Sequence, residues 1–191
     1  MRPPKLKPAI ELPLPPVLPE AVASLQSIEL DVLALYDECA PRLLRYARSF
    51  GLDEQTGEDV VQDAFVALFR HLCLGRPRLS LTGWLFRVTR NLALKRRRST
   101  SAVQSDVVAG FLLERIADPG ESPEERMVFD QRCRRLQAVV RALKPVDRQC
   151  LYLRAEGLSY RDIARAVGMS LGSVSKSLTR AFSRLANADR G

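Results

Sequence analysis

From residue 25 onward, apolar residues recur at the three- and four-residue spacing of an amphipathic helix, and no segment sustains an alternation of apolar and polar residues. This pattern predicts an all-α fold without a sheet. One stripe consists of Tyr36, Ala40, Leu43, Ala47 and Phe50. Pro41 lies inside that stripe and predicts a kink or a new first helical turn there.

Breaks in the pattern divide the chain into four parts. Residues 1–24 hold seven of the twelve prolines and predict an extended arm without regular structure. Residues 25–98 form a first helical domain. Residues 99–121 mix small, polar and helix-breaking residues and predict a flexible linker, after which residues 122–191 form a second small helical domain.

Two helix starts carry capping signals. Thr56 and Asp59 have the spacing of a capping box before one apolar stripe. Ser122 and Glu125 have the same spacing before a second stripe, with Pro123 at the first helical position. Three further helices are expected after breaks near Lys144-Pro145, Glu156-Gly157 and Gly168.

The charge balance favours a polyanionic partner. Thirty Lys and Arg residues against 22 Asp and Glu residues give a net charge of +8, which suits nucleic acid or anionic lipid. The chain has no run of eighteen apolar residues, and its proline-rich start does not resemble a signal peptide, so we expect a cytoplasmic protein without membrane insertion.

Neither a metal site nor a cofactor is expected. The four cysteines lie far apart without a C-x-x-C pair, and His71 is the single histidine. This spacing favours ordinary thiols in a reducing compartment over a zinc site.

The segment 158–185 has the pattern of a helix-turn-helix. A short helix starting at Ser159 or Tyr160 carries the small Ala164 where two helices would cross, and Gly168 supplies the positive φ of a tight turn. The second helix has an apolar stripe of Val174, Leu178, Ala181, Phe182 and Leu185. Its solvent side is expected to carry Ser173, Ser175, Lys176, Ser177, Thr179, Arg180 and Arg184. A plain helical hairpin is the alternative, but small residue, glycine and polar face coincide at helix-turn-helix spacing and favour DNA binding.

Charge is segregated in the first domain. Residues 51–64 contain five acidic side chains and no basic one, whereas residues 84–98 contain six basic side chains and no acidic one. The acidic and the basic segment are therefore expected to bind two different partners. Acids such as Glu58 also stabilise the start of a helix through its dipole. A nuclease site with Asp59 and Asp63 as metal ligands is disfavoured because neighbouring turns offer no histidine and no third well-placed acid.

The basic helix has side chains suited to DNA. Asn91 lies among Arg87, Arg90 and Lys95, and an amide can pair bidentately with an adenine edge. Trp84 and Phe86 could stack on unpaired bases, but Trp84 falls on the apolar stripe and is favoured as a core residue.

Three motifs in this order, TGEDVVQDAFVALFRHL, TGWLFRVTRNLALKRRR and LKPVDRQCLYLRAEGLSYRDIARAVGMSLGSVSKSLTRAFSRL, resemble the extracytoplasmic-function (ECF) group of bacterial RNA polymerase sigma factors. The resemblance covers residues 29–188. It implies a non-enzymatic sigma factor, monomeric when free, whose partners are core RNA polymerase, promoter DNA and an anti-sigma factor.

The resemblance also implies roles for matching residues. The acidic helix with Glu58, Asp59, Gln62 and Asp63 would grip the clamp helices of the polymerase's largest subunit. The next helix would open the promoter −10 element with Arg87, Arg90, Asn91, Lys95 and Arg97, and the loop Arg78 to Gly83 would form a wall of the base pocket. The helix-turn-helix would bind the −35 element through the solvent-side residues of its second helix.

The chain departs from the family pattern at three places. Ser175-Lys176-Ser177 stands where the family usually has a lysine-serine-arginine run, and Lys95 stands where it usually has aspartate. The proline-rich arm has no counterpart. A helix-turn-helix regulator that is not a polymerase subunit is the main alternative. It predicts a preceding domain of alternating strands and helices, and the sequence shows no such pattern. An RNA-binding or nuclease domain built on the basic helix is a second alternative.

Overall fold

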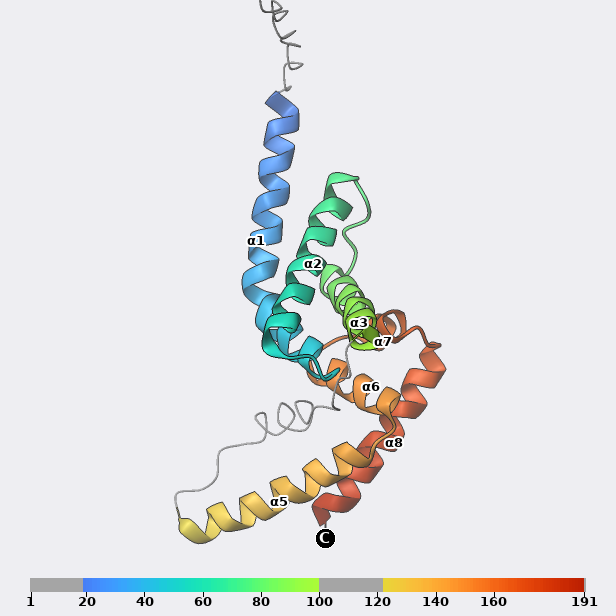
Figure 1. Cartoon of the computed structure of the whole chain (residues 1–191). Coiled ribbons are helices and arrows are strands. Elements are labelled where there is room, and N and C mark those ends of the chain that lie inside the picture. Colours follow the sequence, from blue (N-terminus) through green and yellow to red (C-terminus); the bar gives the residue numbers. More distant parts are fainter. Residues whose placement is uncertain (1–18, 100–121, 191) are drawn as a thin grey trace, which may run out of the picture.

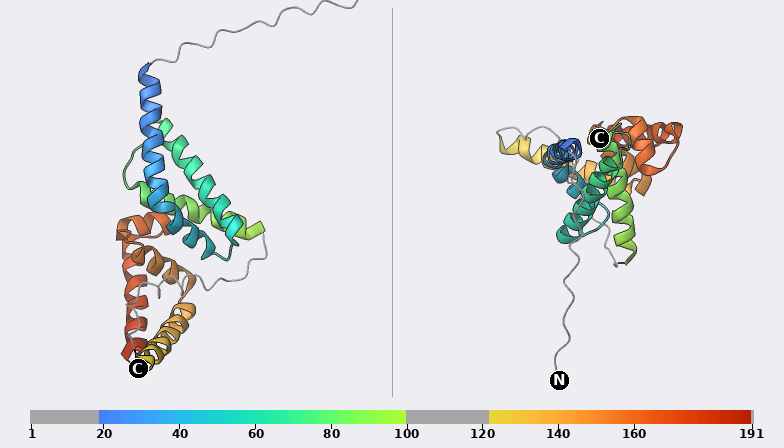
Figure 2. Two further views of the ribbon diagram at one scale, coloured as in Figure 1. Left: turned by 90° about the vertical axis from the view of Figure 1, so that its left-hand side faces the viewer. Right: turned by 90° about the horizontal axis from the view of Figure 1, so that it is seen from above.

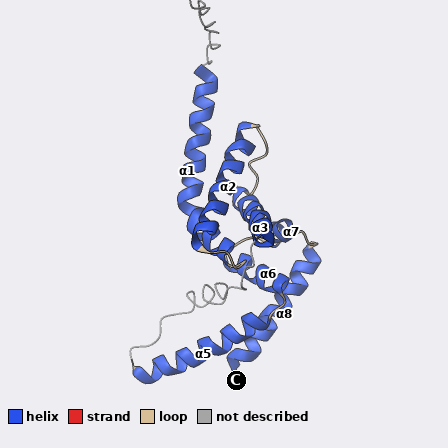
Figure 3. Cartoon of the chain, viewed as in Figure 1, coloured by secondary structure: helices blue, strands red, loops and turns tan. Residues whose placement is uncertain are grey.

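The computed structural model describes residues 19–99 and 122–190, and within these ranges every regular element is an α-helix (Figures 1 and 3). The expected all-helical architecture is thereby confirmed. The N-terminal unit contains α1 (Pro19–Arg48), α2 (Glu54–Cys73) and α3 (Leu81–Ser99), and the C-terminal unit contains α5 (Pro123–Ala142), α6 (Pro145–Ala155), α7 (Tyr160–Val167) and α8 (Leu171–Arg190). Most of the expected linker and residues 1–18 of the expected arm lie outside the described residues.

Helix α1 begins earlier than the sequence predicted. Its first residue is Pro19, so residues 19–24 are helical and the prediction of an arm without regular structure up to residue 24 is wrong there. Proline is well accepted at the first helical position, and no further proline occurs before Pro41. The N-terminal end of α1 extends beyond α2 (Figure 1), and Pro41 lies inside α1, which is one continuous helix.

Helix α2 begins at a different cap from the predicted one. Asp53 is the N-cap: its carboxylate accepts hydrogen bonds from the Thr56 backbone N–H at 2.7 Å and the Thr56 hydroxyl at 3.0 Å. The Thr56–Asp59 capping box is therefore wrong, because a carboxylate three residues upstream already satisfies the first turn.

The C-terminal unit has the caps that the sequence predicts. The Ser122 hydroxyl accepts from the Glu125 N–H, and the Glu125 carboxylate accepts from the Ser122 N–H, which completes the capping box. Ser159 caps α7, and Gly168 ends that helix in the left-handed region with φ of 72°. The tight turn between α7 and α8 is confirmed.

The expected apolar stripes are mostly buried, with two exceptions. Leu43 and Ala47 are fully buried, but Tyr36 is 44% exposed. In α8, Val174, Leu178 and Ala181 are fully buried, whereas Phe182 is 45% exposed. Tyr36 and Phe182 therefore lie at the solvent-exposed edges of their apolar stripes.

The two units share one continuous hydrophobic core. Helices α1, α2 and α3 pack on one another, α8 packs on α5, α6 and α7, and α7 packs on α3 (Figures 1 and 2). The Tyr46 ring of α1 stacks on the Tyr152 ring of α6, with 5.2 Å between the ring centroids. The sequence predicted two separate domains and gave no sign of this contact.

None of the helices in the described ranges has the length and apolar character required to cross a membrane.

Candidate protein and nucleic-acid interfaces

An acidic surface covers the outer face of α2. The predicted residues Glu58, Asp59, Gln62 and Asp63 are all exposed there, so the structure brings them together. Asp63 forms an exposed ion pair with Arg96 of α3, with 3.3 Å between the carboxylate oxygen and the guanidinium nitrogen. This surface is open to a protein partner with positive charge.

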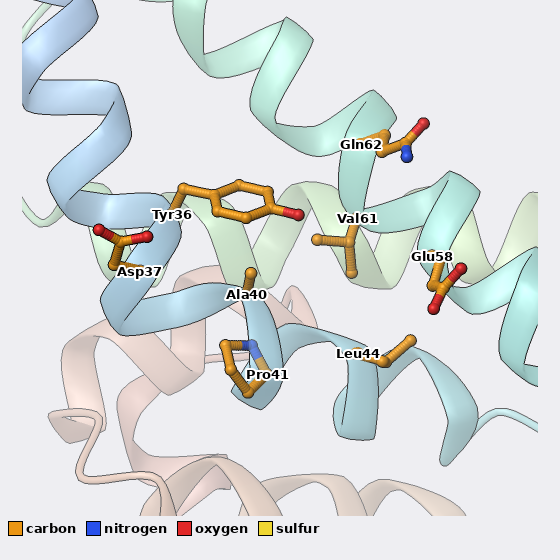
Figure 4. Close-up of a pocket in the computed structure, with 8 residues that line it drawn as sticks. All are labelled: Tyr36, Asp37, Ala40, Pro41, Leu44, Glu58, Val61 and Gln62. Atoms are coloured by element: carbon orange, nitrogen blue, oxygen red, sulfur yellow. The ribbon is translucent and has the colours of Figure 1, made fainter.

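A groove of about 560 Å³ lies between α1 and α2 beside the acidic surface (Figure 4). Tyr36 and Val61 point toward each other across it, and Asp37 and Glu58 contribute negative charge. The full lining is Tyr36, Asp37, Ala40, Pro41, Leu44, Glu58, Val61 and Gln62. Apolar side chains with acidic neighbours suit an amphipathic helix that carries basic residues.

The predicted −10 residues of α3 lie on two faces. Arg87, Asn91 and Lys95 follow at four-residue steps and are exposed, as nucleic-acid contact requires. Arg90 is half-buried and donates a hydrogen bond at 3.0 Å to Gln149 of α6. Arg97 is exposed and lines a small cavity with residues of α6 and with the turn that follows α1. The structure therefore brings the first three together and directs the other two toward the C-terminal unit.

The predicted pocket-wall loop, Arg78 to Gly83, is a loop only up to Ser80, because α3 begins at Leu81, and the segment contacts α7. The Ser80 hydroxyl donates a hydrogen bond at 2.7 Å to the Asp162 carboxylate. A Cβ on Gly83 would lie 2.7 Å from the Ser80 Oγ and 3.0 Å from the Asp162 Cβ, so glycine favours this close approach. Trp84, at the start of α3, is half-buried against the core and its ring lies 4.8 Å from the His71 ring.

The outer face of α8 differs from the predicted one at Ser177. Ser175, Lys176, Thr179 and Arg184 are exposed, and Ser173 is half-buried beside Ser170. Ser177 is only 1% exposed, so its assignment to the solvent side is wrong. It lies three residues after Val174 and one before Leu178, which places it on the packed face.

Arg180 is exposed but already engaged within the C-terminal unit. Its guanidinium donates hydrogen bonds to Asp147 of α6 at 2.9 and 3.4 Å and to the Ser177 hydroxyl at 3.2 Å. Burial opposes ionisation of Asp147, but the Arg180 and Ser177 hydrogen bonds and the Arg180 charge outweigh it and lower the pKa of this carboxyl. Arg180 therefore helps to fix α8 on α6.

Sequence reasoning missed a polar contact between the two units. Glu156 at the end of α6 is buried, and its carboxylate accepts a hydrogen bond from Arg42 Nε at 2.6 Å. Arg45 lies 3.8 Å from the same carboxylate. These residues are more than a hundred positions apart, and no local pattern in a single sequence links them.

The described residues contain no group of three or more His, Cys, Asp or Glu side chains placed to hold a metal ion. Within residues 19–99 and 122–190, the four cysteines are free thiols, with Cys39 and Cys150 buried.

Comparison with known proteins places these surfaces in a family. The family model "Sigma-70 region 2" matches residues 35–103, and "Sigma-70, region 4" matches residues 133–185. The chain is 32% identical to the ECF RNA polymerase sigma factor SigL of Mycobacterium tuberculosis over 149 residues, which cover 76% of this chain and 81% of SigL. The chain belongs to the ECF sigma factors. Its region 2 match begins within α1 and includes α2 and α3, and its region 4 match begins within α5 and ends within α8.

Two further similarities agree with this membership. The sigma factor is 30% identical over 149 residues to the ECF sigma factor SigE of Mycolicibacterium smegmatis, covering 76% of this chain and 56% of SigE. It thus spans about half the length of that relative. A solved structure of the sigma factor RpoE with the anti-sigma factor NepR from Bartonella quintana has a TM-score of 0.55 and 20% identity, covering 85% of this chain and 96% of that chain. This likeness shows the fold.

Proposed function

We propose that this sigma factor binds core RNA polymerase, directs it to specific promoters and assists opening of the DNA in the cytoplasm, without catalysing a reaction itself. The observation that carries the proposal is the charge division within region 2: an exposed acidic face on α2 and an exposed basic face with Asn91 on α3. One domain therefore presents separate surfaces to a protein and to DNA.

The acidic surface and the adjoining groove are the proposed polymerase contact. Glu58, Asp59, Gln62 and Asp63 supply its polar part, and the groove beside them supplies apolar area between α1 and α2. Apolar contact surrounded by charge is the composition that favours a stable and oriented protein complex.

The two DNA surfaces have different tasks in this proposal. Arg87, Asn91 and Lys95 of α3 contact the −10 element, with Arg90 and Arg97 joining when region 4 moves away. In region 4, Ser175, Lys176, Thr179 and Arg184 contact the −35 element, flanked by Ser173 and Arg180. Serine and threonine hydroxyls suit base edges, and the basic side chains suit phosphates.

Domain boundaries follow from this division of tasks. We assign residues 25–98 to region 2, residues 99–121 to a linker and residues 122–191 to region 4. Each DNA surface alone is weak, but polymerase would fix their separation and make the second contact nearly intramolecular. The free protein is therefore expected to bind promoter DNA weakly.

Run-off transcription on a promoter library, with purified core polymerase, tests the proposal. Asp63→Arg reverses charge on the acidic surface and should abolish promoter-specific transcripts and core binding. Asp130→Arg makes the same reversal on an exposed position of α5 and serves as the matched control. Asn91→Ala should reduce transcripts but retain core binding.

One combination of results would contradict the proposed function. If the protein does not bind core polymerase and yields no transcripts, yet binds duplex DNA tightly by itself, the sigma-factor function is wrong and a regulator that acts without being a polymerase subunit replaces it.

An anti-sigma factor is a further proposed partner. The support is the groove between α1 and α2, which suits a helix, and the fold shared with a sigma factor solved together with an anti-sigma factor. Such a partner would compete with core polymerase. A co-expressed candidate should therefore prevent core binding by the wild-type protein, and simultaneous binding of both would contradict this assignment.

A further inference from the structure

Region 4 covers an arginine-rich part of region 2. Arg42 donates from Nε to the Glu156 carboxylate and from its terminal nitrogen to the Glu156 backbone carbonyl, both at 2.6 Å. Arg45, one turn along α1, lies 3.8 Å from the other carboxylate oxygen. The Glu156 side chain is 0% exposed, so region 4 inserts a buried carboxylate between two arginines.

An aromatic ring accompanies this carboxylate. Tyr152 precedes Glu156 by one turn of α6, and its ring stacks on Tyr46 with 5.2 Å between the centroids and 27° between the planes. The Tyr152 hydroxyl reaches the backbone carbonyl of Arg42 at 3.5 Å. A flat ring and an anion are thus presented together to α1.

Region 2 supports this site with its own residues. The Arg42 guanidinium lies 5.7 Å above the Phe86 ring of α3 and 3.4 Å from Glu38 of α1. Tyr46 also packs against Phe86, with 5.3 Å between the centroids. These contacts do not involve region 4, so the positions of Arg42 and Tyr46 are held by α1 and α3.

We infer that this face of region 2 is a binding site for single-stranded DNA, which α6 occupies in the structure. The Tyr152 ring stands in for an unpaired base, and the Glu156 carboxylate stands in for a phosphate. Stacking aromatics with adjacent arginines is the combination that binds single strands without sequence preference. The inference rests on the proposed function, because promoter opening supplies the single strand.

The site adjoins the proposed −10 surface. Arg90 precedes Asn91 on α3 and contacts Gln149 of α6, so it lies between the exposed face of α3 and the face that α6 covers. A strand bound at Arg87 and Asn91 could continue past Arg90 to Arg42 and Arg45. Separation of region 4 from region 2 would extend the DNA-binding surface from α3 onto α1.

The contact with region 4 leaves polar groups without hydrogen bonds. Among the described residues, none donates to or accepts from the buried Tyr46 hydroxyl, and none donates to Glu156 Oε1. The Tyr46 hydroxyl without a hydrogen bond, and a Glu156 oxygen held only by the 3.8 Å ion pair with Arg45, oppose the closed arrangement. DNA therefore competes with a contact that is incompletely satisfied.

The test measures binding of a fluorescent 20-nucleotide thymidine strand to the full chain by anisotropy at several salt concentrations. Glu156→Gln keeps the shape but removes the competing charge, and it should tighten binding about tenfold. Each phosphate newly contacted should steepen the slope of log K against log salt by about 0.7. Asp189→Asn, which removes an equal charge from an exposed ion pair with Arg132, should change neither quantity.

Two arginines of α1 provide the matched comparison. Arg45→Ala should cancel the gain in the Glu156→Gln background, while Arg48→Ala should preserve it, because Arg48 pairs with Glu54 inside region 2. The same comparison in the otherwise unchanged chain, where Arg45→Ala should weaken the residual binding and Arg48→Ala should not, remains decisive if Glu156→Gln fails to fold.

Equal effects of the two arginine substitutions would overturn the inference, as would a gain confined to duplex DNA of the same length. No polymerase is present in this assay. A working sigma factor without Arg45-dependent strand binding would therefore disprove the inference alone, whereas absent transcription would disprove the proposed function.

Discussion

Gly168 ends α7 and sets the turn to α8, and its replacement by alanine should destabilise the protein. Its φ of 72° lies in the left-handed region, and a Cβ there would meet no atom within 4 Å. The cost is therefore backbone strain alone, about 1–2 kcal/mol. The smaller entropy of an unfolded chain with alanine offsets about 0.4–1 kcal/mol, which leaves a net loss of roughly 1 kcal/mol.

Gly172 provides the opposite case four residues later. It lies in the first turn of α8 without a positive φ, and a Cβ there would also meet nothing within 4 Å. Gly172→Ala should therefore raise stability, by up to about 1 kcal/mol. The same chemical change is predicted to have opposite signs at two nearby positions.

Thermal unfolding followed by far-ultraviolet circular dichroism measures the difference. For a chain of this length, 1 kcal/mol corresponds to about 2–4 °C in Tm, so the two variants should differ by about 4–8 °C. Urea unfolding should show a changed midpoint with an unchanged m-value. A Gly168→Ala protein as stable as the Gly172→Ala protein would refute the left-handed turn.

Two other predictions concern titration. Because its pKa is lowered in the folded protein, Asp147 contributes stability above the pKa of an unfolded aspartate, and this stability is lost as the pH falls through the folded pKa. Asp147→Asn should therefore make the free energy of unfolding less dependent on pH below about pH 4. An unchanged pH dependence in this acidic range would contradict the pairing with Arg180. Burial and the nearby Asp147 charge raise the pKa of Cys150 to about 11. At pH 8 a disulfide reagent should therefore modify the exposed Cys73 in the folded protein, and Cys150 only after unfolding. Equal modification rates of the two thiols in the folded protein would contradict the buried position of Cys150.

Local features of the fold were predictable from sequence because their causes are local. The Ser122–Glu125 capping box and the Gly168 turn each depend on residues within a few positions, and both are confirmed. The start of α2 was misplaced because two capping patterns overlap, and the Asp53 carboxylate prevails over the Thr56 hydroxyl. Competing local signals of similar strength cannot be ranked from sequence alone.

Tertiary features depend on which helices pack together. The acidic face of α2 and the outward face of α3 follow from helical periodicity, so Asp63 and Asn91 lie where they were expected. The turning of Arg90 toward region 4 and the burial of Ser177 depend on which helix packs beside them. Residue types and spacing do not specify that neighbour.

The Asp147–Arg180–Ser177 contact described above divides the outer positions of α8 into two kinds. Lys176 and Thr179 are exposed and take no part in that contact, so substitutions there would change the proposed −35 surface at little cost in stability. Changes at Ser177 or Arg180 also alter the seating of α8 on α6. If α8 binds the −35 element as proposed, new promoter specificities should therefore be engineered at Lys176 and Thr179, while Ser177 and Arg180 are kept to hold α8 on α6.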